Sequence, residues 1–196
     1  AEAARRAGAI ILTECAVRAL DITGGQVSGV VTEKGRIRAR QVVIAGGVWS
    51  RTLLRNHGVT FPQLRIVGTV ARVEGVTGLP DHPVGTENFS VRPRVDGGHT
   101  LTLRNANIAE ILPDNIRFLR QFLPRLRDNW REFHLRAGPS FFREARRPRC
   151  WSADERTVFE DIRSLDPSPS RQFLRRALAN ATRAFPAFTN ARTTHA

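Results

Sequence analysis

The 196-residue sequence contains no methionine, no tyrosine and only one lysine, Lys34, among its 31 basic residues. No apolar run approaches the roughly 20 residues that a transmembrane helix needs, so we expect no membrane span. Its two cysteines, Cys15 and Cys150, lie far apart and form no C-x-x-C motif. This usage predicts a reducing, cytoplasmic setting. The histidines are isolated and the cysteines lack metal-ligand spacing, so we expect no metal site.

Two further absences concern the ends of the sequence. The chain does not begin with methionine, and residues 1–7, rich in Ala and Arg, have high helix propensity from the first position. No G-x-G-x-x-G phosphate loop occurs anywhere. We therefore expect an internal fragment of a longer protein that is inactive on its own. The alternative is a complete small α+β protein.

The formal net charge of +13 raises the question of a nucleic-acid partner. The arginines are scattered from Arg5 to Arg192 instead of forming one stripe, and aromatic residues stand among them at spacings that suit helix packing. Such a preference for Arg over Lys is more often a coding preference than a phosphate-binding surface. We expect no nucleic-acid partner, with a non-catalytic Arg-rich binding module as the alternative.

The run VVIAGGVWS at residues 42–50 is the most informative part of the sequence. Residues 42–44 are apolar and β-branched, which predicts a strand buried on both faces. The small residues 45–47 allow another group to come close to the backbone. Residues 49–57 then predict a helix that ends at Gly58. A strand, a small-residue turn and a helix start in this order can place a phosphate or ribose on main-chain N–H groups.

The surrounding pattern predicts the rest of the N-terminal part. We expect a helix at residues 1–7 and a strand at 9–12 that flanks the interior strand 42–44. Between them, Gly24-Gly25 and Lys34-Gly35 are turn signals. They separate an expected antiparallel meander of three strands, at residues 17–22, 27–32 and 36–38.

A second domain is predicted after Phe61-Pro62, which has the character of a linker. We expect a strand at residues 64–73 and a hairpin of strands 89–95 and 99–104. A helix should begin at Pro113 and be interrupted at Pro124. Further helices are expected at residues 126–136 and from Ser170 to about residue 184. Residues 140–154 show no assignable pattern.

Together these motifs resemble the FAD-dependent amino acid and amine oxidases of the D-amino acid oxidase, glycine oxidase and sarcosine oxidase superfamily. The strongest matches are VRAL at 17–20, VSGVVTEKG at 27–35 and VVIAGGVWS at 42–50. Weaker matches are RPRVDGG at 92–98, LPD at 112–114, RSLDPSP at 163–169 and FP at 185–186.

The resemblance implies an α/β (α+β) fold in three parts. Residues 1–60 would be the C-terminal portion of the FAD-binding, Rossmann-like domain with its β-meander. Residues 61–190 would form the mixed-sheet substrate-binding domain with helices, and residues 191–196 would begin the return to the FAD domain.

The resemblance also implies FAD as the cofactor and a set of residues that contact it. Val17 would meet the adenine end through its main chain. Ala45, Gly46, Gly47 and Trp49 would pass close to the diphosphate and ribose. The alternative is that the glycines only allow a tight strand-to-helix turn.

For the substrate, the resemblance points to the hairpin, where Ser90, Arg92 and Arg94 become candidates for contacting a carboxylate. Several members of the family use a tyrosine here, and this chain has none. An arginine on a strand is also often only solvated. No catalytic residue can be assigned from the sequence.

The implied activity is oxidation of the C–N bond of a small-molecule substrate, an amino acid or a secondary amine, with hydride transfer to the flavin and hydrolysis of the imine. The alternative is a related flavoprotein with other chemistry, such as a dehydrogenase subunit or a tRNA-modifying flavoenzyme. An oligomer or a subunit of a larger dehydrogenase is compatible with either activity.

Overall fold

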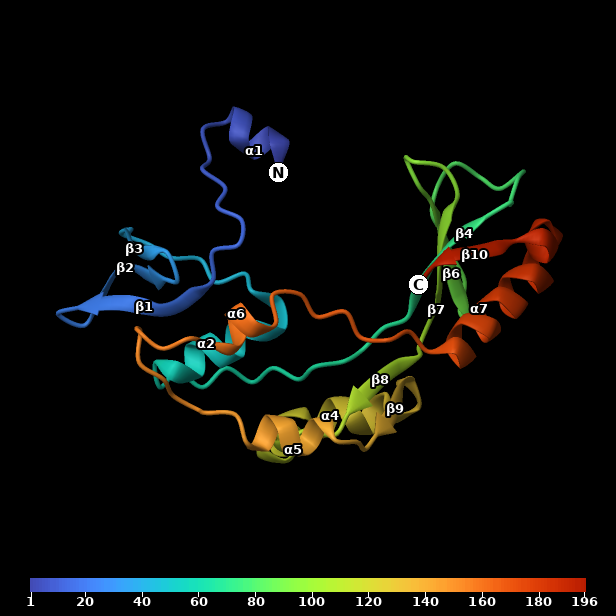
Figure 1. The fold of residues 1–196 in the computed structure, drawn as a ribbon. Helices are drawn as coiled ribbons and strands as arrows, with labels where there is room; N and C mark the ends of the chain where they lie inside the picture. The colour runs from blue at the N-terminus through green and yellow to red at the C-terminus, as the bar shows by residue number, and fades with distance from the viewer. The chain divides into compact units, whose positions relative to one another are not determined.

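The computed structural model describes all residues, 1–196, and divides them into two compact units (Figure 1). The N-terminal unit combines Ala1–Gln63 with Arg147–Asp166, and the C-terminal unit combines Leu64–Arg146 with Pro167–Ala196. The sequence places residues 147–166 in the second domain, whereas in the structure they pack within the N-terminal unit. We call Arg147–Asp166 the strap. The functional division into cofactor and substrate domains stays a prediction.

The N-terminal unit begins with α1 (Glu2–Arg6) and contains the predicted meander. Its three antiparallel strands, in the order β1-β2-β3, are β1 (Val17–Thr23), β2 (Gln26–Thr32) and β3 (Gly35–Arg38). Gly24 and Gly25 have φ of 58° and 78°, a region that favours glycine, and form the first turn. The meander prediction is confirmed.

The predicted helix after the glycine turn is also present. Gly47–Trp49 form a 3₁₀ turn, η1, which leads into α2 (Ser50–Asn56). The helix ends at Asn56, His57 is its C-cap, and Gly58 follows with φ of 72°. This left-handed residue terminates the helix as the sequence predicts.

The predicted interior strand at residues 42–44 and its neighbour at 9–12 are wrong. Neither segment belongs to a sheet, and Ile10 and Val43 are 87% and 90% exposed. The meander strands pair only with one another, and no strand of this chain pairs with either segment. A β-branched run favours an extended backbone, but a strand also needs a partner for its main-chain groups.

The strap contains a short helix, α6 (Val158–Asp161). Thr157 precedes it, and Glu160 accepts hydrogen bonds from both the main-chain N–H and the hydroxyl of Thr157, at 2.9 and 3.1 Å. This capping arrangement satisfies donors that a helix start leaves without intrahelical partners.

The C-terminal unit is built on a five-stranded antiparallel sheet with the order β10-β4-β7-β6-β5. Its strands are β4 (Val70–Glu74), β5 (Val84–Gly85), β6 (Phe89–Pro93), β7 (His99–Leu103) and β10 (Arg192–His195). The predicted hairpin is confirmed as β6 and β7. The predicted strand at 64–73 is shorter than expected and begins only at Val70.

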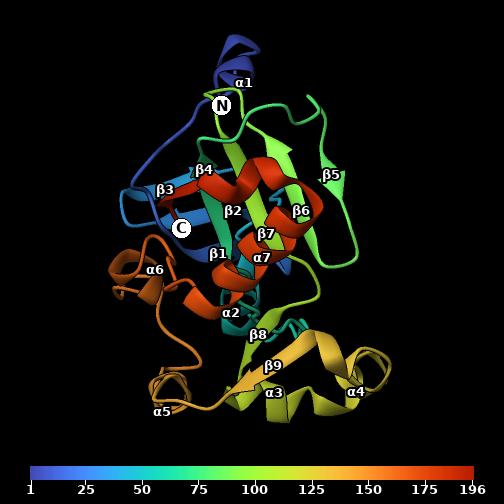
Figure 2. The same ribbon diagram turned by 90° about the vertical axis from the view of Figure 1, so that its right-hand side faces the viewer.

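Helix α7 (Arg171–Ala184) covers one face of this sheet (Figure 2). The Ser170 hydroxyl accepts the N–H of Phe173 at 3.3 Å, which confirms the predicted helix start. Phe173, Ala177 and Ala181 recur every four residues and are buried in the core with strand residues of β4, β6 and β7. The small side chains of Ala177 and Ala181 let the helix lie close to the sheet.

The C-terminal unit also contains a two-stranded sheet that the sequence does not predict. β8 (Asn107–Glu110) pairs in parallel with β9 (Phe133–Arg136), so residues 126–136 are not one helix. Pairing with β8 outweighs local helix propensity at β9. Between these strands lie α3 (Pro113–Arg117), α4 (Leu119–Asp128) and the 3₁₀ turn η2 (Trp130–Glu132).

Pro124 lies inside α4, so the predicted interruption at this proline is wrong. The break falls instead at Phe118, which is 3% exposed and separates α3 from α4. The unassigned region contains α5 (Ser140–Ala145), and residues 186–190 form a 3₁₀ turn, η3 (Pro186–Asn190).

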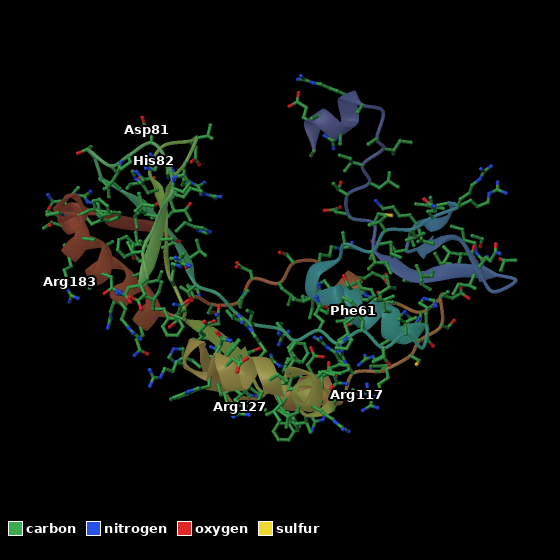
Figure 3. The ribbon with its side chains drawn as sticks, turned by 180° about the vertical axis from the view of Figure 1, so that it is seen from behind. Phe61, Asp81, His82, Arg117, Arg127 and Arg183 are labelled. Atoms are coloured by element: carbon green, nitrogen blue, oxygen red, sulfur yellow. The ribbon has the colours of Figure 1, made fainter.

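The arginines do not gather on one element. Arg117, Arg127 and Arg183 are exposed and lie on α3, α4 and α7 of the C-terminal unit (Figure 3). None of the helices has both the length and the apolar character needed to cross a membrane.

Candidate functional site

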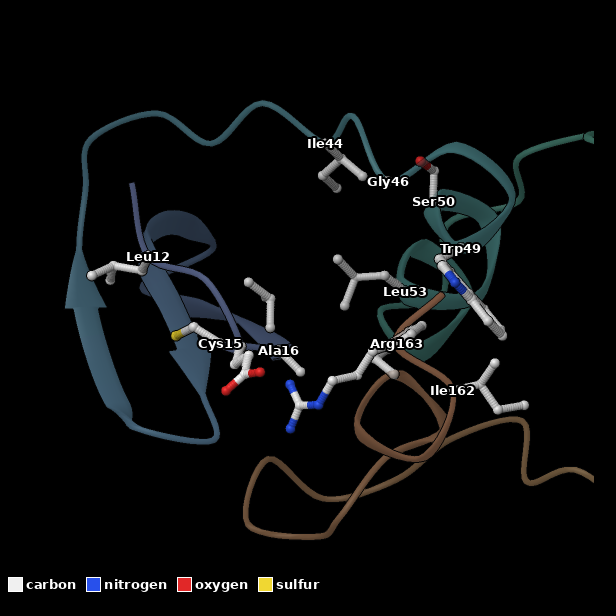
Figure 4. Close-up of a pocket in the computed structure, with 13 residues that line it drawn as sticks. Leu12, Cys15, Ala16, Ile44, Gly46, Trp49, Ser50, Leu53, Ile162 and Arg163 are labelled. Carbon is white, nitrogen blue, oxygen red and sulfur yellow. The ribbon is translucent and has the colours of Figure 1, made fainter. Parts of the chain in front are cut away.

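A cavity of about 490 Å³ lies within the N-terminal unit (Figure 4). Three parts of the chain line it: residues 12–17 at the start of β1, residues 44–53 through α2, and residues 159–163 of the strap. Most of the lining side chains are apolar. The cavity therefore suits a ligand with a largely apolar body and a few polar contacts.

Three of the five residues predicted to contact a cofactor meet at this cavity: Val17, Gly46 and Trp49. Ala45 and Gly47 are exposed neighbours of Gly46 and do not line it. A Cβ atom added at Gly46 would lie 3.6 Å from the main-chain nitrogen and hydroxyl of Ser50, an ordinary contact distance. The fold therefore tolerates a side chain at residue 46, while the cavity would lose space.

An aromatic row stands beside the cavity. Phe159 meets Trp49 and Trp151 edge to face, with 5.7 Å between ring centroids in both pairs. The guanidinium carbon of Arg147 lies 5.8 Å from the centroid of Trp49. Because the rings restrain one another, Trp49 and Phe159 present a fixed aromatic wall to the cavity.

An ion pair joins the strap to the turn between β2 and β3. Two nitrogens of Arg163 donate to the two carboxylate oxygens of Glu33, each at 2.8 Å. Glu33 also accepts the main-chain N–H of Ala16 at 2.7 Å. The bonds from Arg163, followed by the one from Ala16, lower the pKa of Glu33 to about 2. The carboxylate is therefore ionised throughout the physiological pH range.

A second ion pair fastens the strap to β1. Glu160 accepts from Nε and Nη2 of Arg18 at 3.0 and 2.9 Å, and the glutamate side chain is only 7% exposed. These bonds, together with those from Thr157, lower the pKa of Glu160 to about 2. Nearby, the indole N–H of Trp151 donates to the main-chain carbonyl of Arg18 at 2.8 Å.

The predicted substrate residues lie in the C-terminal unit, on β6 and just after it. Phe89 and Val91 of β6 are buried against α7, so Ser90 and Arg92 belong to the opposite face of the sheet. The cross-strand partners of Ser90 and Arg92 are Thr102 and Thr100. This polar face thus combines hydroxyl groups with a guanidinium group.

Arg94 differs from Arg92 in its surroundings. Its Nε and Nη2 atoms donate to the two oxygens of Asp96 at 2.8 and 2.9 Å. Arg72 donates to the same carboxylate at 3.1 Å. Both arginines are exposed, but Arg94 is bound within its own turn, whereas Arg92 makes no ion pair.

A second, smaller cavity lies within the C-terminal unit, with a volume of about 360 Å³. It is lined mainly by apolar residues of α3, α4, β8 and β9. Arg65 also lines it and donates to Glu110 at 2.8 Å, and Arg136 donates to the other oxygen of Glu110 at 2.7 Å. No group of three or more His, Cys, Asp or Glu side chains is arranged to hold a metal ion.

Sequence reasoning missed the contribution of the strap. Phe159, Ile162 and Arg163 line the first cavity although they lie more than a hundred residues from its other walls. Their spacing of i, i+3 and i+4 is typical of one helical face and was the available signal. Nothing in the sequence indicated which surface that face would meet.

Comparison with known proteins identifies the family of the chain. The family model described as "DAO: FAD dependent oxidoreductase" matches residues 1–196. A D-amino acid dehydrogenase of Sinorhizobium medicae (strain WSM419) is 46% identical over 52 residues, which is 26% of this chain and 12% of that protein.

Two solved structures are similar over nearly the whole chain. The L-amino acid deaminase from Proteus myxofaciens in complex with anthranilate matches with a TM-score of 0.91 and 30% identity, covering 99% of this chain and 43% of that chain. The L-amino acid deaminase from Proteus vulgaris matches with a TM-score of 0.87 and 29% identity, covering 98% and 45%. The chain thus spans less than half the length of these relatives. With the family model matched from its first residue to its last, the chain belongs to the DAO family of FAD-dependent oxidoreductases.

Proposed function

We propose that this chain is part of an FAD-dependent oxidoreductase that oxidises the C–N bond of an amino acid or a secondary amine. The observation that carries the proposal is the cavity of the N-terminal unit. The chain belongs to a family of FAD-dependent oxidoreductases, and three of the residues that we expect to contact FAD, Val17, Gly46 and Trp49, line this one cavity. The names of the relatives describe enzymes that act on amino acids, but this chain covers less than half the length of the relatives with solved structures. The activity is therefore proposed for the whole protein.

The residues around the cavity fit a portion of FAD. Its volume of about 490 Å³ lies within the range of roughly 300–1,000 Å³ that is typical of ligand pockets. Gly46 leaves open the space that a Cβ atom would fill without a clash. In this proposal the main chain at Val17 meets the adenine end, and the turn of Ala45, Gly46 and Gly47 with Trp49 passes the diphosphate and ribose.

FAD, when bound, supplies the acceptor for the hydride that leaves the carbon bearing the amine. The nitrogen loses a proton in the same oxidation, and water hydrolyses the resulting imine to an oxo product and ammonia or an amine. The chain's own contribution is to hold and orient the reactants. On the C-terminal unit we assign this role to Ser90 and Arg92 of the polar face, with Arg94 as a weaker candidate because Asp96 already binds it.

The test is made on the full-length protein. After purification with added FAD, we expect the visible spectrum of a bound flavin. Under anaerobic conditions, D-amino acids, L-amino acids and secondary amines are added separately, and bleaching by one class would identify the substrate. Peroxide formation on readmission of air would then distinguish an oxidase from a dehydrogenase that needs another acceptor. A flavoprotein that none of these compounds bleaches would contradict the proposed activity and favour related flavin chemistry.

A further inference from the structure

The strap supplies the outer wall of the candidate cofactor cavity. Phe159 lies in α6, Ile162 and Arg163 follow directly after it, and all three line this cavity. The remaining lining comes from the two N-terminal segments, residues 12–17 and 44–53. The cavity thus exists only when a segment distant in sequence lies against them.

The Arg163–Glu33 pair fastens this wall at the cavity. Figure 4 shows Arg163 reaching from the strap toward Cys15 and Ala16, which lie on the facing segment. Glu33 holds both sides, because it accepts two bonds from Arg163 and one from the main chain of Ala16. Charge-assisted, bidentate bonds of this kind fix geometry more strongly than a single neutral bond.

The rest of the strap has its own attachment. Glu160 binds Arg18, and Trp151 donates to the carbonyl of Arg18 and packs edge to face with Phe159. The main-chain N–H of Trp151 also donates to Asn56 of α2 at 2.8 Å. Loss of the Arg163 pair would therefore loosen the cavity wall locally, while the strap remains attached to β1 and α2.

We propose that the strap retains the cofactor: Phe159 and Ile162 form an apolar wall against bound FAD, and Arg163 is a positioning residue that keeps this wall closed through Glu33. The proposal rests on the assignment of this cavity to FAD in the proposed function. It adds residues that lie outside the family motif at 42–50. It also makes FAD affinity depend on the ion pair of Arg163, a residue more than a hundred positions from that motif in the sequence.

The first test compares FAD affinities of full-length variants. Arg163→Met removes the ion pair but keeps an unbranched apolar stem, and Phe159→Leu reduces the wall. Arg156→Met is the matched control, since Arg156 pairs with Asp161 at 2.8 Å in the same strap but does not line the cavity. Titration of apoprotein, followed by flavin fluorescence, should show roughly five- to tenfold weaker binding for Arg163→Met and Phe159→Leu. The control should stay within about twofold of wild type.

The second test measures how accessible the cavity is, through the reactivity of a cysteine, and does not depend on catalysis. Cys15 lines the cavity, whereas Cys150 is an exposed thiol of the same chain and serves as the internal reference. The rate of alkylation by N-ethylmaleimide at each cysteine is followed by peptide mass spectrometry. FAD should slow the reaction at Cys15 relative to Cys150. Without FAD, Arg163→Met should react several-fold faster at Cys15 than wild type does, and Arg163→Lys should restore most of the protection.

The outcomes separate this proposal from the one it rests on. If wild type binds FAD and FAD protects Cys15, but Arg163→Met and Phe159→Leu behave like Arg156→Met, the role of the strap is overturned while the cofactor site stands. If wild type binds FAD without any protection of Cys15, the assignment of this cavity fails, and the inference fails with it.

Discussion

The Nε2 atom of His57 accepts the main-chain N–H of Leu20 at 2.9 Å. The bond joins the end of α2 to β1, and it requires a neutral imidazole, because a protonated histidine has no acceptor nitrogen. Burial lowers the pKa of His57 from its usual value of 6.5. The stability of the N-terminal unit is thereby linked to pH.

We predict that the contribution of His57 to the free energy of unfolding rises as the pH increases toward 6.5 and is constant above it. With a folded-state pKa below the unfolded one, the unfolded chain binds more protons, so the contribution is present above pH 6.5 and is lost as the pH falls through the folded pKa. Thermal unfolding between pH 5 and 8 would measure it. His57→Gln should flatten this dependence, whereas the same change at the exposed His82 should leave it intact.

A second prediction concerns Gly29, in the middle of β2. A Cβ atom there would lie 2.1 Å from the carbonyl oxygen of Ile37 on the paired strand β3. Gly29→Ala should therefore separate β2 from β3 and destabilise the protein by about 3 kcal/mol or more. Gly68→Ala is the control, because a Cβ at Gly68 meets no atom within 4 Å. Equal unfolding temperatures of the two variants would contradict the close approach.

The elements that the sequence predicts correctly are those decided by neighbouring residues. The meander follows from its glycine turns, and the start of α7 follows from the Ser170 cap. The wrong predictions concern segments whose secondary structure depends on residues far away in the sequence. Residues 133–136 form a strand because β8 is available as a partner, whereas residues 42–44 have the composition of a strand but no partner within this chain.

The candidate cofactor site divides in the same way. Val17, Gly46 and Trp49 belong to local motifs, and the structure brings them to one cavity. Phe159 and Arg163 could not be placed from the sequence, because their position depends on Glu160 meeting Arg18 across 142 residues of sequence. Such a contact leaves no local pattern in the chain.

A third prediction is that substitutions at Gly46 affect flavin binding and the stability of the fold differently. Gly46→Ala places its Cβ at ordinary contact distances within the protein, so the unfolding temperature should be nearly unchanged. Gly46→Val adds two methyl groups beside the cavity and should lower flavin content after purification severalfold. The two quantities are measured by thermal unfolding and by the ratio of visible to ultraviolet absorbance. Full flavin occupancy in Gly46→Val would count against contact between this turn and FAD.

A fourth prediction concerns helix α7. The hydroxyl of Ser170 accepts the N–H of Phe173, and the main-chain N–H of Ser170 donates to the hydroxyl of Thr69 at 3.0 Å. Ser170→Ala removes the cap and should cost about 1 kcal/mol of unfolding free energy. Ser170→Asp can still accept the Phe173 bond and should recover most of the loss. Chemical denaturation of the three proteins would measure both differences.

The last prediction distinguishes the two arginines of the hairpin. If the polar face of the C-terminal sheet binds a substrate carboxylate, the guanidinium that is available for it is that of Arg92, because Asp96 already holds Arg94 through two bonds. Arg92→Met should lower kcat/KM for an amino acid by roughly 10- to 100-fold, which corresponds to the loss of a charged hydrogen bond. Arg94→Met should have a much smaller effect on kcat/KM.

The carboxylate itself provides the control for this prediction. A substrate amine that lacks the carboxylate should react with wild type and Arg92→Met at similar kcat/KM, since neither protein can make the bond with it. Steady-state kinetics with matched substrates, with and without the carboxylate, would measure the difference. An equal loss with both substrates would show that Arg92 maintains the sheet and does not contact the substrate. A large loss in Arg94→Met alone would transfer the role to Arg94 and require the Asp96 pair to open when substrate binds.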